Sequence, residues 1–265
     1  MTDTRQRATQ LDRLLRPDEA RAIVLANVGP LAPEQVPLEQ AGERVLVYPL
    51  IADVSLPPFP AATMDGFAVI HDDPASQRRV LGSGFAGDDP SVTVVPGTAA
   101  KIMTGAPVPS GADAVVPVEN TATSDGIMTI LQPRVGSGEN IRPIGADLRQ
   151  GDRLIEAGTL LGPAEVGLLA SLGHAQALVG RRPRVAIIST GNELVPPGET
   201  PGPGQIRDSN RFSLAVAARR AGAVVVVNRH IRDEEDELRA GIQAALEAAD
   251  VVLTSGGVSK GERDL

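Results

Sequence analysis

Two stretches of this sequence place hydroxyl groups, glycines and carboxylates directly after a short apolar run. Residues 189–194 (Ser-Thr-Gly-Asn-Glu-Leu) follow the apolar residues 185–188, and residues 254–264 (Thr-Ser-Gly-Gly-Val-Ser-Lys-Gly-Glu-Arg-Asp) follow residues 251–253. Glycine lets the backbone approach a ligand closely, and backbone N–H groups and hydroxyls hold anions. Neither stretch contains the G-x-G-x-x-G dinucleotide pattern or the G-x-x-x-x-G-K-[ST] phosphate loop. The chemistry they indicate is the binding of a phosphate or a pterin edge.

The second stretch also carries candidate metal ligands. Glu262 and Asp264 follow the paired glycines Gly256 and Gly257, and Mg²⁺ prefers carboxylate and phosphate oxygens. A solvated charged segment is the alternative interpretation there, and an ordinary strand-to-loop turn is the alternative for residues 189–194.

Several further polar residues have a structural explanation beside a functional one. Asp208 or Ser209 is suited to cap a helix that starts nearby, and residues 233–236 (Asp-Glu-Glu-Asp) form a potential capping box. The loop of residues 194–207 is long for a compact domain, which favours a functional role. Earlier in the chain, turn formation alone accounts for Asp65 in Met-Asp-Gly and for Thr104 before a glycine. Asp147 has no independent signal, and we expect the three histidines to lie at the surface.

The elements that position these residues are predicted from hydrophobic periodicity. Short β-branched runs at 184–189, 223–228 and 250–255 predict buried parallel strands, and helices are expected at about 209–221 and 233–248. Ligands of an open α/β sheet bind at the carboxyl ends of its strands. Three strands and two helices make a thin sheet, so this domain looks incomplete.

The rest of the chain divides into two further predicted parts. Residues 47–133 show short alternating strands with Gly, Pro or Asp every eight to twelve residues, which predicts a small barrel-like all-β unit. Helices are expected from Pro17 and over residues 163–172. We therefore predict a multidomain α/β plus β chain: a discontinuous N-terminal and linking domain (1–46 and 134–180), the inserted β domain (47–133) and a partial three-layer α/β domain (181–265).

Composition excludes several function classes. The chain has 265 residues, 25 Lys and Arg against 33 Asp and Glu, a formal charge of -8 and no cysteine. Scarce aromatic residues and scattered charge argue against nucleic-acid binding, and the absence of cysteine excludes disulfides and thiolate sites. No apolar run approaches the length of a membrane helix, and the polar N-terminus is not a signal peptide. We expect a cytoplasmic protein.

Six motifs in order resemble the molybdopterin molybdenumtransferase family, also called MoeA, and the equivalent domain of gephyrin. The resemblance covers nearly all of residues 17–265. The motifs are Leu-Pro-Pro-Phe (56–59) with Met-Asp-Gly-Phe-Ala (64–68), Met-Thr-Gly-Ala-Pro-Val-Pro (103–109) with Gly-Ala-Asp-Ala-Val-Val (111–116), Gly-Glu-Asn-Ile-Arg (138–142), Ser-Thr-Gly-Asn-Glu-Leu (189–194), Gln-Ile-Arg-Asp-Ser-Asn (205–210), and Thr-Ser-Gly-Gly-Val-Ser (254–259) with Gly261-Glu262.

The resemblance implies an enzyme of molybdenum-cofactor biosynthesis that inserts molybdate into adenylylated molybdopterin and releases AMP with Mg²⁺. It also implies an elongated homodimer whose clefts combine the β unit of one subunit with the α/β unit of the other, and contact with other enzymes of the pathway. Asp147 is a weaker candidate site residue. The positions implied for catalysis are Asp65, Thr104, Glu193, Asp233 and Asp264; those implied for cofactor binding are Thr190, Gly191, Asp208, Ser209, Ser255, Gly256, Gly257 and Ser259; and those implied for the metal are Glu193, Glu262 and Asp264.

Two departures from the family pattern affect these expectations. Residues 60–63 (Pro-Ala-Ala-Thr) replace the polar Asn-Ser-Ala that usually precedes Met-Asp-Gly, which changes the surroundings of Asp65. The family's α/β domain also continues past the position of Leu265 with basic residues, and a small β domain follows. If the protein ends there, we expect weak or absent turnover. A non-catalytic molybdopterin-binding or scaffold module is the alternative function.

Overall fold

The computed structural model describes residues 15–84, 87, 92–131 and 135–256. The chain forms two compact units, one of residues 1–48 and 157–265 and the other of residues 49–156. Residues 134–156, which the sequence analysis grouped with the N-terminal part, belong to the second unit, while the three-domain division stays a prediction. Among the described residues, no helix is both long and apolar enough to cross a membrane.

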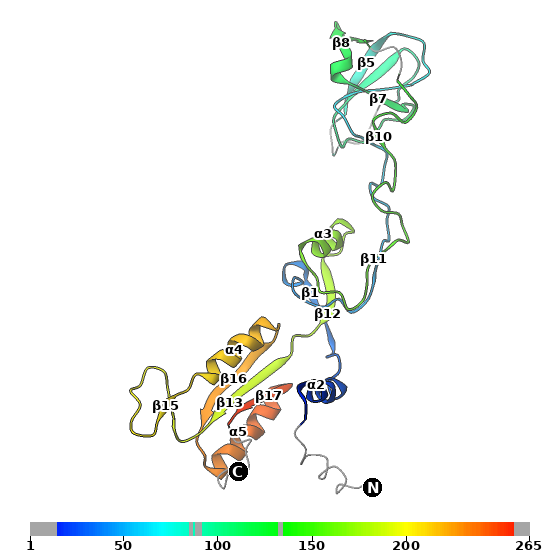
Figure 1. The fold of residues 1–265 in the computed structure, drawn as a ribbon. Helices are drawn as coiled ribbons and strands as arrows, with labels where there is room; N and C mark the ends of the chain where they lie inside the picture. The colour runs from blue at the N-terminus through cyan, green and yellow to red at the C-terminus, as the bar shows by residue number, and fades with distance from the viewer. Residues whose placement is uncertain (1–14, 85–86, 88–91, 132–134, 257–265) are drawn as a thin grey trace, which may run out of the picture. The chain divides into compact units, whose positions relative to one another are not determined.

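The unit of residues 49–156 is built on a six-stranded sheet (Figure 1). The strand order is β7-β4-β6-β5-β9-β8, and every neighbouring pair is antiparallel except β5 and β6. Its strands are β4 (Gly66–Val69), β5 (Gln77–Gly84), β6 (Thr98–Ile102), β7 (Ala114–Pro117), β8 (Thr121–Ser124) and β9 (Ile127–Ile130), and the short helix η2 (Val118–Asn120) joins β7 to β8. This sheet accounts for the strand pattern predicted in residues 47–133.

Strands β4 and β7 are buried on both faces, which explains their continuous apolar sequence. Phe67 and Val69 pack in one apolar cluster with Met128, whereas Ala68 packs in a second cluster with Ile102 on the other face. Two short antiparallel pairs complete the unit: β2 (Leu50–Ile51) with β11 (Arg153–Ile155), and β3 (Ala61–Ala62) with β10 (Ile141–Arg142).

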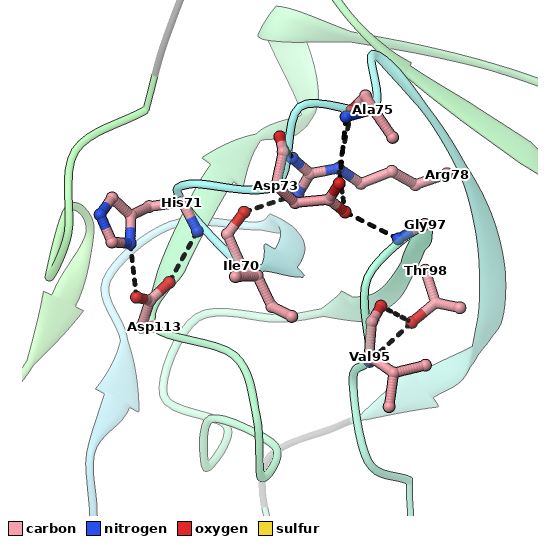
Figure 2. Close-up of polar contacts among 9 residues, drawn as sticks. All are labelled: Ile70, His71, Asp73, Ala75, Arg78, Val95, Gly97, Thr98 and Asp113. Atoms are coloured by element: carbon pink, nitrogen blue, oxygen red, sulfur yellow. Dashed lines mark hydrogen bonds and ion pairs between the residues drawn. The ribbon is translucent and has the colours of Figure 1, made fainter.

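A buried arginine holds the loop between β4 and β5 (Figure 2). Arg78, 2% exposed, donates hydrogen bonds to the carbonyls of Ile70 and Asp73, both at 3.0 Å, and of Ala75 at 3.1 Å. The Asp73 carboxylate accepts from the Gly97 N–H at 2.7 Å and lies 3.5 Å from the guanidinium. Burial raises the pKa of Asp73, but the bonds from the Gly97 and Ala75 amides and the charge of Arg78 outweigh burial and lower it overall.

The N-terminal elements of the other unit are a helix, a short antiparallel sheet and a second helix. Pro opens both predicted helices, which are α2 (Pro17–Ala26) and α3 (Pro163–Ser171). β1 (Pro33–Pro37) pairs with β12 (Gln176–Gly180), and the short helix η1 (Leu38–Gln40) follows β1. Arg44, 7% exposed, ties these strands together because it donates to the Gly180 carbonyl at 2.8 Å and pairs with Glu34.

The remaining residues of this unit form a three-stranded parallel sheet between two helices (Figure 1). The strand order is β16-β13-β17, with both neighbours parallel to the central strand. α4 covers one face through Val185 and Ile187, and α5 covers the other through Ala186 and Ile188. The elements are β13 (Arg184–Thr190), β14 (Leu194–Val195), β15 (Ile206–Arg207), α4 (Asn210–Arg220), β16 (Val224–Ile231), α5 (Glu235–Ala248) and β17 (Val251–Ser255). The predicted parallel strands and helices are confirmed, but the expected burial holds for β13 and is wrong for β16 and β17, because these two strands lie at the edges of the sheet.

Replacing Arg78 with Met will lower the free energy of unfolding by about 3 kcal/mol, because it leaves the buried Asp73 carboxylate without its cation and three carbonyls without their donor. Arg79→Met is the matched control, since Arg79 is the exposed neighbour on the same strand, and its effect should stay within about 0.5 kcal/mol. Urea denaturation of the three proteins measures both values. Equal losses in the two variants would contradict this role of Arg78.

Candidate functional site

The carboxyl ends of the parallel strands bring two of the predicted loops together. β13 pairs with both neighbours, so Thr190 lies beside Ile231, and Ser189 lies beside Ser255. Gly256 follows with φ +104°, and a Cβ built there would stand 2.7 Å from the Thr190 hydroxyl and 2.8 Å from its carbonyl oxygen. Because real Cβ atoms do not approach so closely, this position requires glycine, as the pattern of hydroxyls and glycines predicted.

Asp208 is buried directly behind this edge of the sheet. Its side chain is 3% exposed, and one carboxylate oxygen accepts from the Ser189 hydroxyl at 2.6 Å and from the Arg211 guanidinium at 2.8 Å. The other oxygen accepts from the Arg211 N–H at 3.3 Å, in the first turn of α4. This gives Asp208 a capping role toward α4, in agreement with the structural alternative, while a direct role in binding cofactor stays a prediction.

The ionisation of Asp208 stabilises the fold. Burial raises its pKa, but the hydrogen bonds from Ser189 and Arg211 and the Arg211 charge outweigh burial and lower the pKa overall. A carboxylate with a lowered folded-state pKa stabilises the protein above its ordinary pKa, and this contribution is lost as the pH falls through the lowered value. The network is therefore intact at neutral pH.

The first turn of α4 also reaches the end of β17. Asn210 donates from its side-chain amide to the Ser255 hydroxyl at 2.9 Å. Ser209 occupies the N-cap position, is exposed, and makes no side-chain capping bond within the described chain. Ser209 is thus at the surface, and the ligand-binding role implied for it stays a prediction.

The loop after β13 is bonded to the loop after β16. The Asn192 N–H donates to Asp233, and the Asp233 N–H donates to the Asn192 side chain, both at 3.3 Å. The expected capping box at residues 233–236 is wrong: Glu234 is the N-cap of α5 and makes no side-chain capping bond in the described residues. Asp233 instead belongs to the loop pair, because its carboxylate is directed at the Asn192 amide.

Glu193 is exposed, and its carboxylate folds back over Gly191. A Cβ built on Gly191, whose φ is +138°, would stand 2.5 Å from one Glu193 carboxylate oxygen and 2.6 Å from the other. His230 lies next to this turn, with its Nε2 2.8 Å from the Gly191 carbonyl oxygen. The expectation that the histidines are plain surface residues is wrong for His71, whose Nδ1 lies 2.6 Å from the Asp113 carboxylate, and for His230. No pattern marked His230, because its partner is a main-chain atom 39 residues away.

Asp65 and Thr104 form a separate pair in the other unit. One oxygen of Asp65 accepts from both the backbone N–H and the hydroxyl of Thr104, each at 2.7 Å. These two bonds, the main-chain one first, lower the pKa of Asp65 below its ordinary value. Asp147 in the same unit is ion-paired with Arg142.

The predicted metal and cofactor residues Gly257, Ser259, Glu262 and Asp264 lie outside the described residues. Within residues 15–256, apart from the gaps named above, no three His, Asp or Glu side chains cluster closely enough to hold a metal ion. Of the three predicted metal ligands, Glu193 is the one that lies within the described residues, where it is exposed in the loop after β13.

A double-mutant cycle tests the buried Asp208 network. Ser189→Ala should cost about 1–2 kcal/mol of unfolding free energy, because it removes a hydroxyl donor from a buried carboxylate. Ser189→Ala and Asp208→Asn remove the same hydrogen bond. The double variant should therefore lose at least about 0.5 kcal/mol less unfolding free energy than the sum of the losses in the two single variants. Thermal or urea denaturation measures the cycle. Strict additivity would contradict the Ser189–Asp208 bond.

Comparisons with known proteins agree with these elements. The family described as the MoeA N-terminal region (domain I and II) matches residues 15–173, and a probable molybdopterin binding domain matches residues 186–265. Molybdopterin molybdenumtransferase 2 of Mycobacterium tuberculosis is 40% identical over 251 residues, which are 92% of this chain and 62% of that protein. Molybdopterin molybdenumtransferase of Haemophilus influenzae is 37% identical over 256 residues, 95% of this chain and 63% of that protein.

Solved structures give the same picture. Two crystal structures of the molybdopterin biosynthesis MoeA protein from Pyrococcus horikoshii match 92% of this chain, with TM-scores of 0.80 and 0.82 at 33% and 29% identity. The match covers 64% and 67% of those chains. This chain thus spans a little under two thirds of the length of the curated relatives it matches. Because the two family models together account for nearly all of its described residues, the chain belongs to the MoeA family.

Proposed function

We propose that this chain acts in molybdenum-cofactor biosynthesis as a molybdopterin molybdenumtransferase: it binds adenylylated molybdopterin, inserts molybdate and releases AMP. The observation that carries the proposal is the carboxyl edge of the parallel sheet, where the Thr190 hydroxyl and the backbone at Gly256 lie in close contact. This edge lies inside the region that matches the molybdopterin-binding family. Exposed N–H groups and hydroxyls at strand ends suit the anionic phosphates and the pterin of such a ligand.

The donor set at this edge suits Mg²⁺. Glu193 presents an exposed carboxylate, and Asp233 lies on the loop bonded to the same turn, so both offer the hard oxygen ligands that this ion prefers. Glu262 and Asp264, outside the described residues, are the further proposed ligands. When bound, the ion neutralises charge on the phosphate oxygens while the phosphoanhydride is cleaved.

Asp65 is the proposed catalytic carboxylate from the other unit. Thr104 holds one of its oxygens with two hydrogen bonds, which fixes the orientation of the second oxygen without occupying it. Because its pKa is lowered, Asp65 is ionised at neutral and mildly acidic pH. A fixed, ionised and accessible carboxylate is suited to hold a metal or to orient a nucleophile during anhydride cleavage.

The first test is molybdate-dependent AMP release from adenylylated molybdopterin in the presence of Mg²⁺. We expect slow but measurable release by the unmodified chain and a further loss of about 100-fold or more in Asp65→Asn, which keeps the shape of the side chain but removes its charge. Asp125→Asn is the matched control, since Asp125 is an exposed carboxylate in the same unit at φ +52°, which asparagine adopts readily. It should release AMP at the unmodified rate.

The same assay separates this function from the non-catalytic alternative. Binding of molybdopterin without AMP release by the unmodified chain would favour a binding or scaffold module. Absence of both, in protein shown to be folded by circular dichroism, would contradict the proposed function altogether.

We propose further that the chain forms a homodimer, with α2 at the contact between copies. Ile23, Val24 and Leu25 of α2 are 50%, 61% and 56% exposed, and Val28 just beyond the helix is 57% exposed. A ten-residue helix is marginally stable in water by itself, so burial of its apolar side chains is needed to hold it. A second copy of the chain supplies that cover in this proposal.

Paired substitutions on opposite faces of α2 test the dimer. Ile23→Gln with Val24→Gln should weaken self-association by about tenfold or more, because polar side chains would be buried at the contact. Ala22→Gln introduces the same residue on the side of the helix away from Ile23 and Val24, next to Leu25, and should weaken association much less than the paired change. Light scattering over a concentration series gives the mass of each protein. A monomeric unmodified chain would contradict this arrangement.

A further inference from the structure

In the turn that presents Glu193, the Gly191 carbonyl oxygen has two hydrogen-bond partners, one inside the turn and one on β16. The Gly191 carbonyl accepts from the Leu194 N–H at 3.3 Å, which closes the turn, and lies 2.8 Å from Nε2 of His230. Gly191 is buried and has a φ of +138°, a conformation that other residues rarely adopt. The orientation of this peptide therefore helps to set the direction of the Glu193 side chain, which lies over Gly191, while the Ile206 N–H holds the Glu193 carbonyl at 2.8 Å.

His230 makes the shortest of the described bonds that hold this turn to β16 and its loop. The reciprocal bonds between Asn192 and Asp233 are both 3.3 Å long, at the weak end of the usual range. A carbonyl oxygen can only accept, so Nε2 of His230 must carry the hydrogen and donate it. The shorter and better-defined bond is thus the one from the ring.

The ring is also rigidly placed. His230 is the register partner of Ser189 on the central strand, and Ser189 is fully buried and bonded to Asp208. His230 lies on an edge strand of the sheet, but that strand is paired along its length with β13, so the ring has less freedom to move than the loop has. The imidazole therefore acts as a fixed point for the turn.

We infer that His230 is a positioning residue: its ring N–H holds the Gly191 carbonyl and thereby sets the place of the Glu193 carboxylate at the sheet edge. The assignment of Glu193 as a Mg²⁺ ligand rests on the proposed function. The hydrogen bond and its effect on the turn do not, so the two can be tested apart.

The first measurement is amide hydrogen exchange in residues 191–195 of the unmodified chain, of His230→Leu and of His230→Gln. Leucine fills similar space without a donor, and the glutamine amide can place an N–H near the position of Nε2. We expect about tenfold faster exchange at the Leu194 amide in His230→Leu, and recovery to within about threefold in His230→Gln. The amide of Ile187, within β13, reports any general loss of stability.

Unchanged exchange in His230→Leu would overturn the inference. So would equal acceleration in both variants, because that would assign His230 a packing role without a specific donor. His174→Gln, a histidine of the same unit outside this turn, is the control and should leave residues 191–195 unaffected.

The second measurement is the Mg²⁺ dependence of AMP release. Because loss of a group that orients a metal ligand weakens metal binding about 10- to 100-fold, His230→Leu should raise the Mg²⁺ concentration for half-maximal rate by about tenfold, with kcat at saturating Mg²⁺ within about threefold. In His230→Gln, the Mg²⁺ concentration for half-maximal rate should return most of the way to that of the unmodified chain. A fall in kcat with no change in Mg²⁺ dependence would contradict the positioning of Glu193. If the unmodified chain releases no AMP, the proposed function fails while the exchange result still decides the role of His230.

Discussion

The α/β part of this chain depends on one buried negative charge. A carboxylate that is 3% exposed, as Asp208 is, costs several kcal/mol unless hydrogen bonds and an opposite charge compensate it. Ser189, on the central strand, and Arg211, in the first turn of α4, provide that compensation. Arg211 also donates to the Asn228 carbonyl on β16 at 3.2 Å. The buried Asp208 carboxylate requires these hydrogen bonds. They therefore hold β13, β16, the start of α4 and the end of the loop of residues 194–207 in one arrangement.

The position of the candidate ligand edge follows from this constraint. The loop of residues 194–207 leaves β13 and returns through a short parallel pair, in which Leu194 lies beside Ile206 and Val195 beside Arg207. Asp208 comes directly after that pair, so its burial fixes the end of the loop and the start of α4. The start of α4 then places Asn210 against Ser255 at the end of β17. Residues far apart in sequence thus meet at this edge of the sheet. Their meeting does not require a direct hydrogen bond between the loop after β13 and the loop after β17, which carry most of the hydroxyls.

The sequence predicted the regular elements better than the side-chain partners. Alternate apolar residues on β13 face the two helices in turn, and this pattern can be read directly from residues 185–188. The requirement for glycine at Gly256 was also predictable, because paired glycines after a buried strand signal a close approach. His230 was not predictable, since its contact is with a main-chain oxygen whose position depends on the register of β13 and β16. The assignment of Asp233 to a helix cap was wrong for a similar reason. The local spacing of residues 233–236 favoured a capping box, but the Asp233 carboxylate instead accepts from the Asn192 N–H in another loop.

Asp65 and Asp208 show how surroundings separate two roles for the same chemical group. Both carboxylates have lowered pKa values and both accept bonds from a hydroxyl. Asp208 has both oxygens bonded inside the fold, so its charge serves to hold strands and helix together. Asp65 accepts both of its described side-chain hydrogen bonds on one oxygen, and Thr104 donates both of them. Asp65 also lies at the surface of its unit. A carboxylate with one fixed oxygen and one accessible oxygen can meet an ion or a reacting group without first breaking an internal bond. The two carboxylates therefore differ in bonding and exposure, which residue type and local motif do not reveal, and this difference is why Asp65 is the one proposed for catalysis.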